Sequence, residues 1–184
     1  MRWLAPLVPV AVLVAGAMVW HTTAAVFSGG TQNAGNAFAT GSVSLDDDDG
    51  GVAPFSVSGM QRSDTGSRCI AVSYTGSLNA AVKLYAASVT GQLAPYLDLT
   101  IEQGTGGGFS SCAGFAPSAT LFSGTLQAFG AAATSHASGI GSWSPTAPGQ
   151  SRTFRVTYTL SPSAPASVQH GVAGAQLTWE ARSS

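Results

Sequence analysis

The clearest feature of the sequence is a strict alternation of apolar and polar side chains in residues 97–102, 154–160 and 175–182. In residues 97–102, for example, Leu, Leu and Ile alternate with Asp, Thr and Glu. A period of two is typical of strands that bury one face and expose the other, as in antiparallel sheets. The pattern therefore predicts three antiparallel strands.

Weaker alternation with the same period marks four further segments, around residues 43–45, 55–57, 70–74 and 82–86. Clusters of Gly, Asn, Pro and Ser separate these segments, and no long stretch has the 3.6-residue period of a helix. Roughly seven or eight short strands with turn signals between them favour an all-β fold. We expect an antiparallel β-sandwich of jelly-roll type.

The pattern predicts at most one short helix, over residues 125–133. Leu126, Phe129 and Ala133 share a face at helical spacing, but Gly130 interrupts this short segment and weakens the prediction. Three stretches rich in small and polar residues are predicted to be loops, namely residues 104–108, 135–149 and 161–167.

Residues 1–25 have the layout of a secretory signal peptide. Arg2 gives a positive start, residues 4–20 carry no charge, and residues 22–25 form a small-residue exit. We expect cleavage to leave residues 26–184 as a single secreted domain. An uncleaved N-terminal anchor is the alternative, and it is the only contact with a membrane that we expect.

Charge is scarce along the whole chain. Charged residues make up 8% of the sequence and the formal net charge is −1, whereas ordinary soluble domains contain about 25% charged residues. No basic stripe is present to neutralise phosphates, so we expect no nucleic-acid partner. A surface so poor in charge opposes self-association weakly, although high-salt adaptation or a coding bias would also explain it.

The chain contains two cysteines, Cys69 and Cys112. An exported protein meets an oxidising compartment, so the simplest expectation is one disulfide that closes a loop of about 44 residues. Closing such a loop would stabilise the fold by about 4 kcal/mol. Two buried free thiols are the alternative.

The sequence offers little for catalysis. Beyond the signal peptide, only His136 and His170 remain, and neither has a carboxylate or cysteine at the spacing of a metal site. The segment 139–142 is not the G-x-S-x-G elbow of a serine hydrolase, and residues 104–108 lack the lysine of a phosphate loop. We therefore predict no enzyme, no catalytic residue and no cofactor.

One run of acids stands out, from Asp46 through Asp47 and Asp48 to Asp49. Four adjacent carboxylates repel one another unless water or a cation separates them, and Ca²⁺ is the natural candidate because it prefers oxygen ligands. The run lacks the spaced order of a known calcium loop, and neighbouring residues of a strand point to opposite sides. A solvated acidic turn is the stronger interpretation, and calcium remains the weaker one.

Several motifs, in order along the chain, resemble a family of exported proteins with a SipW-type signal peptide, which includes TasA and the camelysin-like proteins called CalY. The resemblance covers most of residues 24–182. Its motifs, read directly from the sequence, are AAVFS at 24–28, FATGSVSL at 38–45, VSYTGSL at 72–78, LFSGTL at 121–126 and LTWEA at 177–181. Gly29 departs from the family's usual Asp, and Tyr74 departs from its usual Asn.

The resemblance implies a jelly-roll domain, cleavage by a dedicated signal peptidase, and a location at the cell surface or in the extracellular matrix of a bacterium. It also implies self-association into the fibres of a biofilm matrix. In such fibres, the N-terminal segment of one subunit completes the sheet of its neighbour. Residues 26–40 fit that role because they carry no charge and contain Val26, Phe27 and Phe38 as apolar anchors. A flexible N-terminus, or one that folds onto its own domain, is the alternative.

Two other functions stay open. The family contains camelysin-type metallopeptidases, which the few histidines of this chain support poorly. A surface adhesin or binding module could instead use the loops at residues 104–108 and 135–149.

Overall fold

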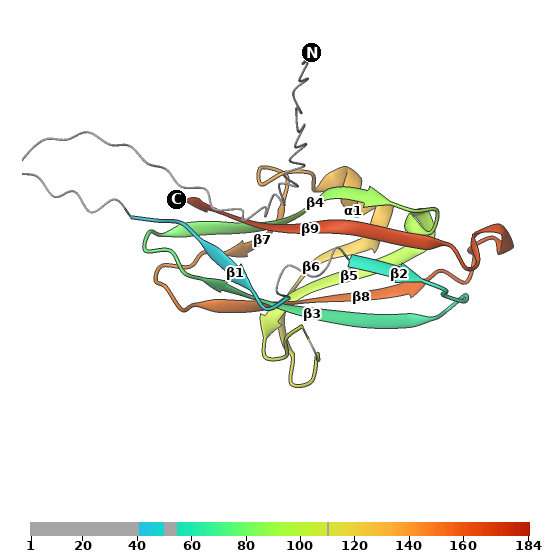
Figure 1. Cartoon of the computed structure of the whole chain (residues 1–184), viewed down its shortest axis with the longest axis horizontal. Coiled ribbons are helices and arrows are strands. Elements are labelled where there is room, and N and C mark those ends of the chain that lie inside the picture. Colours follow the sequence, from blue (N-terminus) through green and yellow to red (C-terminus); the bar gives the residue numbers. More distant parts are fainter. Residues whose placement is uncertain (1–40, 50–54, 110) are drawn as a thin grey trace, which may run out of the picture.

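The computed structural model describes residues 41–49, 55–109 and 111–184. Within these ranges, two antiparallel sheets pack face to face as a sandwich (Figure 1). The five-stranded sheet has the spatial order β1 (Leu45–Asp47), β3 (Thr65–Tyr74), β8 (Ser151–Leu160), β5 (Leu97–Thr105), β6 (Ala116–Thr125). The four-stranded sheet has the order β2 (Phe55–Ser58), β9 (Val172–Ser183), β4 (Ala80–Thr90), β7 (Ile140–Trp143).

The strand pairs are nested within one another. β5 pairs with β6, β4 with β7, β3 with β8 and β2 with β9. This is the order of a single long hairpin that has been rolled up, so that alternate pairs fall into opposite sheets, and it is the topology of a jelly roll. The predicted fold class is thereby confirmed, with β1 as an additional strand at the edge beside β3.

The core lies between the two sheets and follows the alternation of the strands. On β5, Leu97, Leu99 and Ile101 are at most 2% exposed, and on β8 the same holds for Phe154 and Val156. The polar residues between them face the solvent side of the sheet, as the period-two pattern predicts. Burial of such apolar area is the main force that holds the two sheets together.

The short helix α1 (Leu126–Ala132) closes one side of the sandwich by packing on β4. The Thr125 hydroxyl caps it by accepting a hydrogen bond from the Ala128 N–H at 3.1 Å. A Cβ atom at Gly130 would lie 2.4 Å from a methyl carbon of Val89, so only glycine allows the helix to approach β4 this closely. Gly130, which weakened the helix prediction, is therefore the residue that allows the helix to pack closely on β4. Two 3₁₀ turns, η1 (Ala94–Tyr96) and η2 (Ala166–Val168), complete the described elements.

The chain changes sheets between β1 and β2. β1 pairs with one end of β3, through residues 72–74, and β2 pairs with the start of β9, through residues 172–175. In Figure 1 these two short strands lie toward opposite ends of the sandwich. Each sheet therefore has one edge that is covered over only part of its length, a consequence of a strand that switches sheets.

The loop predicted at residues 135–149 is wrong in its middle, because Ile140–Trp143 forms β7. The loop predicted at residues 104–108 starts too early, since β5 extends to Thr105. β6 had no predicted counterpart, although its second half falls on a motif of the family resemblance. No helix among the described residues is long and apolar enough to cross a membrane.

Candidate functional site

The most distinctive surface of the molecule is the uncovered part of the β9 edge. β4 pairs with β9 along one side from Gly174 to Ser183, whereas β2 ends its pairing on the other side at Ala175. From Gln176 onward, no described strand pairs with that second side. Alternate residues of an antiparallel strand direct their N–H and C=O groups away from the paired neighbour. About eight residues, or roughly 26 Å of strand, therefore have no strand partner on this side among the described residues.

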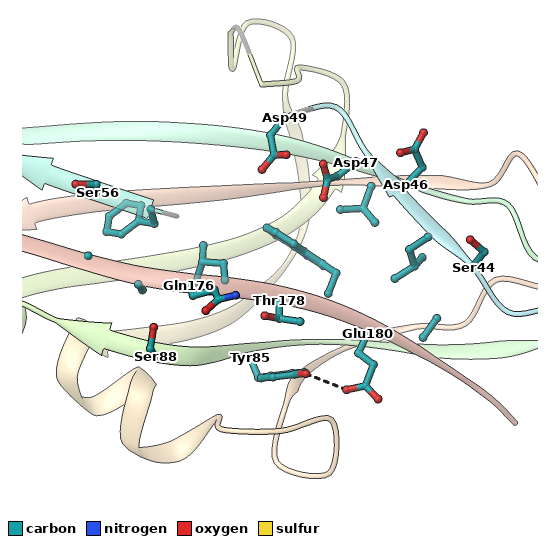
Figure 2. Close-up of a pocket in the computed structure, with 18 of the residues that line it drawn as sticks. Ser44, Asp46, Asp47, Asp49, Ser56, Tyr85, Ser88, Gln176, Thr178 and Glu180 are labelled. Atoms are coloured by element: carbon teal, nitrogen blue, oxygen red, sulfur yellow. Dashed lines mark hydrogen bonds between the residues drawn. The ribbon is translucent and has the colours of Figure 1, made fainter. Parts of the chain in front are cut away.

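A groove of about 920 Å³ runs along this bare edge. β9 and β4 form one side of it, and residues 43–49, which include β1, form the other (Figure 2). We call it the β9 groove. It is partly open to solvent and lies along a strand edge, so it suits an extended chain better than a compact small molecule.

The floor of the β9 groove is apolar and incompletely covered. The inward-facing residues Ala173 and Ala175 are 1% and 2% exposed where β2 covers them. The next residues on the same face, Leu177, Trp179 and Ala181, are only half-buried although they pack against the core. In the described part of the chain, the strand that covers this face ends at Phe55, and these half-buried side chains offer apolar surface that a further strand could bury.

Trp179 contributes an unusual polar atom to this floor. Its ring packs against Phe154, with the ring centroids 5.5 Å apart. The indole Nε1–H is buried and has no hydrogen-bond partner among the described residues. A buried donor without an acceptor typically costs about 1–3 kcal/mol, so the fold retains this side chain at some expense.

The outer face of β9 carries a small polar network. The Tyr85 hydroxyl donates to Glu180 Oε2 at 3.0 Å, as Figure 2 shows, and Arg182 Nε donates to Glu180 Oε1 at 2.7 Å. Burial raises the pKa of Glu180, but the hydrogen bonds from Arg182 and Tyr85 outweigh it and lower the pKa overall. Burial, followed by the Glu180 hydrogen bond, raises the pKa of Tyr85. Both groups therefore keep their ordinary charge at neutral pH.

Asp47 and Asp49 face the groove from the β1 side (Figure 2). Their side chains hydrogen-bond one another. Although Asp47 as a whole is exposed, local burial and then the hydrogen bond and repulsion from Asp49 raise the pKa of its carboxyl from 3.8 to about 6. This wall of the groove therefore changes charge just below neutral pH.

Asp48 has a different role from its neighbours. Its Oδ1 accepts a hydrogen bond from the Ala71 N–H at 2.8 Å, and its Oδ2 accepts one from the Phe109 N–H at 2.7 Å. Its own N–H donates to the Ala71 carbonyl at 3.1 Å. The run of acids therefore does not act as one cluster, because Asp47 and Asp49 line the groove whereas Asp48 binds backbone N–H groups.

Across residues 41–49, 55–109 and 111–184, no three His, Cys, Asp or Glu side chains gather as a metal-binding group. The calcium hypothesis gains no support from this arrangement.

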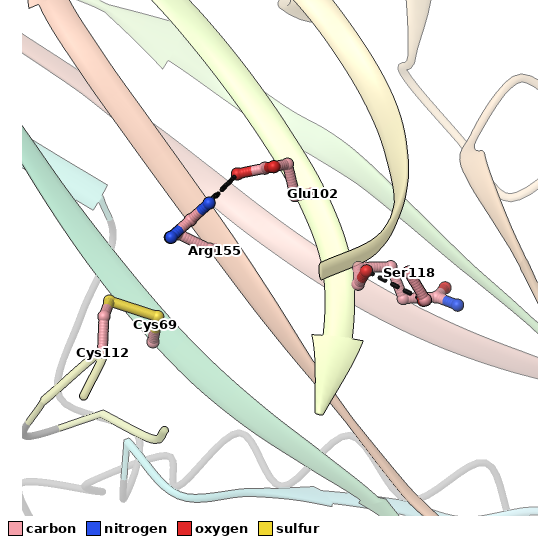
Figure 3. Close-up of polar contacts among 6 residues, drawn as sticks. Cys69, Glu102, Cys112, Ser118 and Arg155 are labelled. Carbon is pink, nitrogen blue, oxygen red and sulfur yellow. Dashed lines mark hydrogen bonds and ion pairs between the residues drawn. A yellow bond between two sulfur atoms is a disulfide. The ribbon is translucent and has the colours of Figure 1, made fainter. Parts of the chain in front are cut away.

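The disulfide predicted between Cys69 and Cys112 is present (Figure 3). It joins β3 to the connection between β5 and β6, residues 106–115, which we call the tethered loop. In the same loop, the Phe115 ring lies 4.6 Å from the Arg155 guanidinium, which also forms an ion pair with Glu102 at 2.7 Å. The tethered loop is thus fastened to the outer face of the five-stranded sheet.

The two histidines lie in separate places. His136 Nε2 is 3.1 Å from the Ala81 carbonyl oxygen, and His170 occupies a tight turn with a positive φ just before β9. The signal peptide at residues 1–25 lies outside the described residues. So does the candidate donor segment 26–40, with Val26, Phe27 and Phe38.

Sequence reasoning missed the β9 groove. The alternation of residues 175–182 located the strand but not the neighbour that it lacks.

Comparison with known proteins adds no relative. No protein-family model matches the chain, and no curated protein matches it. The resemblance to the TasA and camelysin-like family therefore stays a prediction, and the function rests on the geometry of the site.

Proposed function

We propose that this protein is an exported structural subunit that joins other subunits by strand addition into extracellular matrix fibres. The single observation that carries the proposal is the bare edge of β9 over a half-buried apolar floor. An unpaired strand edge is a ready template for another chain, and natural proteins normally protect such an edge. Here the edge adjoins a groove that an extended segment would fill.

The donor in this proposal is the segment 26–40 of a neighbouring subunit. It is about twice as long as the bare edge, so it can fill the β9 groove and still bridge to its own domain. It has no charged side chain, so the groove would not have to desolvate a charge to take it up. Phe27 and Phe38 supply large apolar side chains for the floor.

Backbone pairing and side-chain burial would both contribute to the affinity. Each added backbone hydrogen bond contributes about 0.5–1.5 kcal/mol net, and ordering the donor backbone costs about 1–2 kcal/mol per residue. The hydrogen bonds alone therefore do not hold the strand. Cover for Leu177, Trp179 and Ala181 must supply the remainder, which is why the apolar floor matters to the proposal.

The decisive experiment is electron microscopy of protein that begins at Val26, compared with protein that begins at Gly41. The longer protein is expected to form regular filaments, and the shorter one to remain a folded monomer. A synthetic peptide of residues 26–40 should bind the shorter protein and slow amide exchange on β9, whereas a scrambled peptide should not. Normal filament growth without residues 26–40 would rule out strand donation by this segment.

A matched pair of alanine-to-lysine variants tests the acceptor. Ala181→Lys places a charge on the groove floor, whereas Ala119→Lys places the same charge on β6, an exposed strand of the other sheet. We expect the first variant to block filaments and the second to leave them intact. A zinc ion bound in stoichiometric amount to a persistent monomer would instead favour the camelysin-like alternative.

A further inference from the structure

The tethered loop is connected to β1 as well as to β3. Cys112 bonds covalently to Cys69 on β3 (Figure 3). Three residues before Cys112, the Phe109 N–H donates to Asp48, which directly follows β1. The covalent bond therefore fixes the position of the hydrogen-bond donor that Asp48 uses.

The tethered loop provides one of the hydrogen bonds that hold Asp48, the residue directly after β1. The strand has three residues, and in the described part of the chain it pairs only with β3. Asp48 adds the two side-chain hydrogen bonds to Ala71 and Phe109, and one further backbone bond to Ala71. Strands this short at a sheet edge are prone to local opening, so the loss of one charge-assisted hydrogen bond changes their stability measurably.

We propose that the Cys69–Cys112 disulfide is a redox-sensitive lock on β1. In the oxidised protein, the tethered loop holds the Phe109 N–H against Asp48 and so holds β1 against β3. In the reduced protein, the loop is free to move away, and β1 loses part of its support.

The switching step is ordinary thiol–disulfide exchange. A dithiol reductant gives two electrons to the Sγ–Sγ bond and is itself oxidised to a disulfide. The bond breaks, and Cys69 and Cys112 each take up one proton. The reverse step needs a disulfide donor, which accepts the two electrons while the two protons leave. Compartments outside the cytosol provide such donors.

The lock also regulates the β9 groove, and this consequence rests on the proposed function. β1 belongs to one wall of the groove, so a reduced chain presents an incomplete acceptor. Strand addition would then be favoured only after the chain reaches an oxidising compartment. Premature assembly before export would be suppressed by the same means.

Residue-resolved amide hydrogen exchange of the full chain tests the lock. Exchange at Asp48 and Ala71 is measured in oxidised protein and after reduction with dithiothreitol, with buried Ile101 and Val156 as reference amides. We expect about tenfold faster exchange at the first pair through local opening, whereas the second pair exchanges through global unfolding and reports the separate loss of global stability. Unchanged exchange at Asp48, with both cysteines shown to be thiols by mass, would overturn the lock. Exchange at all four amides at one common rate would mean that the reduced chain opens only as a whole, and the oxidised Gly108→Ala variant then decides.

A second variant decides the matter should the reduced chain unfold. A Cβ atom at Gly108 would lie 2.6 Å from Asp48 Oδ2, so Gly108→Ala displaces that carboxylate oxygen while the disulfide stays closed. The oxidised variant is expected to exchange as fast at Asp48 as reduced wild type. Asp48→Asn should behave similarly, whereas Asp46→Asn makes the same chemical change nearby and should not. Slow exchange in Gly108→Ala would contradict the lock.

Binding of the 26–40 peptide separates the two proposals. Tighter binding to oxidised than to reduced protein supports both the lock and its effect on the groove. Redox-dependent exchange at Asp48 without any peptide binding would support the lock and overturn the proposed function. Equal binding to both forms would overturn the regulatory consequence and leave strand addition standing.

Discussion

Each sheet of the sandwich has one incompletely paired edge, and the two edges are built differently. On β9, the stretch from Gln176 onward adjoins a broad groove with an apolar floor. On β3, residues 65–70 also lack a described strand partner on the β1 side. There, however, the exposed Arg68 reaches across to the Ser56 carbonyl at 3.3 Å, and Cys69 is bonded to the tethered loop.

The difference shows that an unpaired edge is not by itself a binding site. A charged side chain and a covering loop are two of the devices by which natural sheets prevent edge-to-edge pairing. The β3 edge has both, and the hollow beside it is about 290 Å³. Among residues 41–49, 55–109 and 111–184, no strand covers the β9 edge from Gln176 onward, and its inward-facing residues Leu177, Trp179 and Ala181 carry no charge. The side chains under a strand edge and the loops beside it therefore decide whether the edge can bind a further strand.

Removing the disulfide that holds the tethered loop at β3 should have the largest effect on the free energy of unfolding. The cysteines are 43 residues apart in sequence, so Cys69→Ala with Cys112→Ala is expected to lower the free energy of unfolding by about 4 kcal/mol. Urea denaturation of the double variant and of oxidised wild type measures the change. Wild type reduced with dithiothreitol is the control and should agree with the variant. A loss below about 1 kcal/mol would mean that the β3 edge is held closed without the covalent bond.

Substitution of Trp179 in the floor of the β9 groove should have the next largest effect on the free energy of unfolding. Trp179→Ala removes a half-buried ring from the floor and is expected to destabilise the protein by about 2 kcal/mol. Trp179→Phe keeps an aromatic ring but removes the Nε1–H, which has no hydrogen-bond partner in the described part of the chain, so we expect it to be nearly neutral. Thermal unfolding of both variants makes the comparison. A large loss in Trp179→Phe would show that the indole N–H has a partner.

A substitution at the β3 edge should promote self-association of the protein with little effect on its free energy of unfolding. Arg68 is exposed, so Arg68→Leu should change the free energy of unfolding by less than about 0.5 kcal/mol. Self-association measured by light scattering should nevertheless rise, because the β3 edge has lost its charge. Arg152→Leu, which removes a positive charge elsewhere on the five-stranded sheet, is the control. Equal association of the two variants would show that total charge matters and the edge does not.

The smallest expected effect is the pH dependence at Asp47. Its pKa in the folded protein is about 6, above the ordinary 3.8, so the protonated carboxyl favours folding. This contribution is fully present below about pH 4 and is lost as the pH rises through 6. Asp47→Asn should therefore gain stability relative to wild type between pH 5 and pH 8. Chemical denaturation across that range checks the sign, and a constant difference would contradict the shift.

Much of the fold could be predicted from the sequence. Residues 97–102, 154–160 and 175–182 lie in β5, β8 and β9, because those strands keep an uninterrupted period of two. The helix predicted at residues 125–133 forms at Leu126–Ala132, and the two cysteines pair. In each case, the local sequence pattern favours the same structure that the packing of the whole fold requires.

The strands that were missed break the pattern for physical reasons. β6 is an edge strand whose residues are largely exposed, and its pairing with β5 shifts register twice. β7 has four residues and includes Gly141 at a φ of 107°. The candidate site escaped prediction for another reason. The β9 groove depends on where β2 stops pairing, and that is set by the crossing of the chain between sheets. Such a crossing has no periodic signal in sequence.

The connection from β1 through Asp48 to the tethered loop also defines a mechanical route. In a fibre joined through residues 26–40, tension on one subunit enters its domain at Gly41, loads the hydrogen bonds of Ser42 and Ser44 to residues 75–78, and then reaches β1. A three-residue strand in a ladder resists little shear by itself. Asp48 passes part of the load to Ala71 and Phe109, and from the tethered loop it reaches β3 through the Cys69–Cys112 bond. The short strand β1 would thus be supported by the covalent Cys69–Cys112 bond. The extensibility of a fibre would therefore depend on the oxidation state of its subunits.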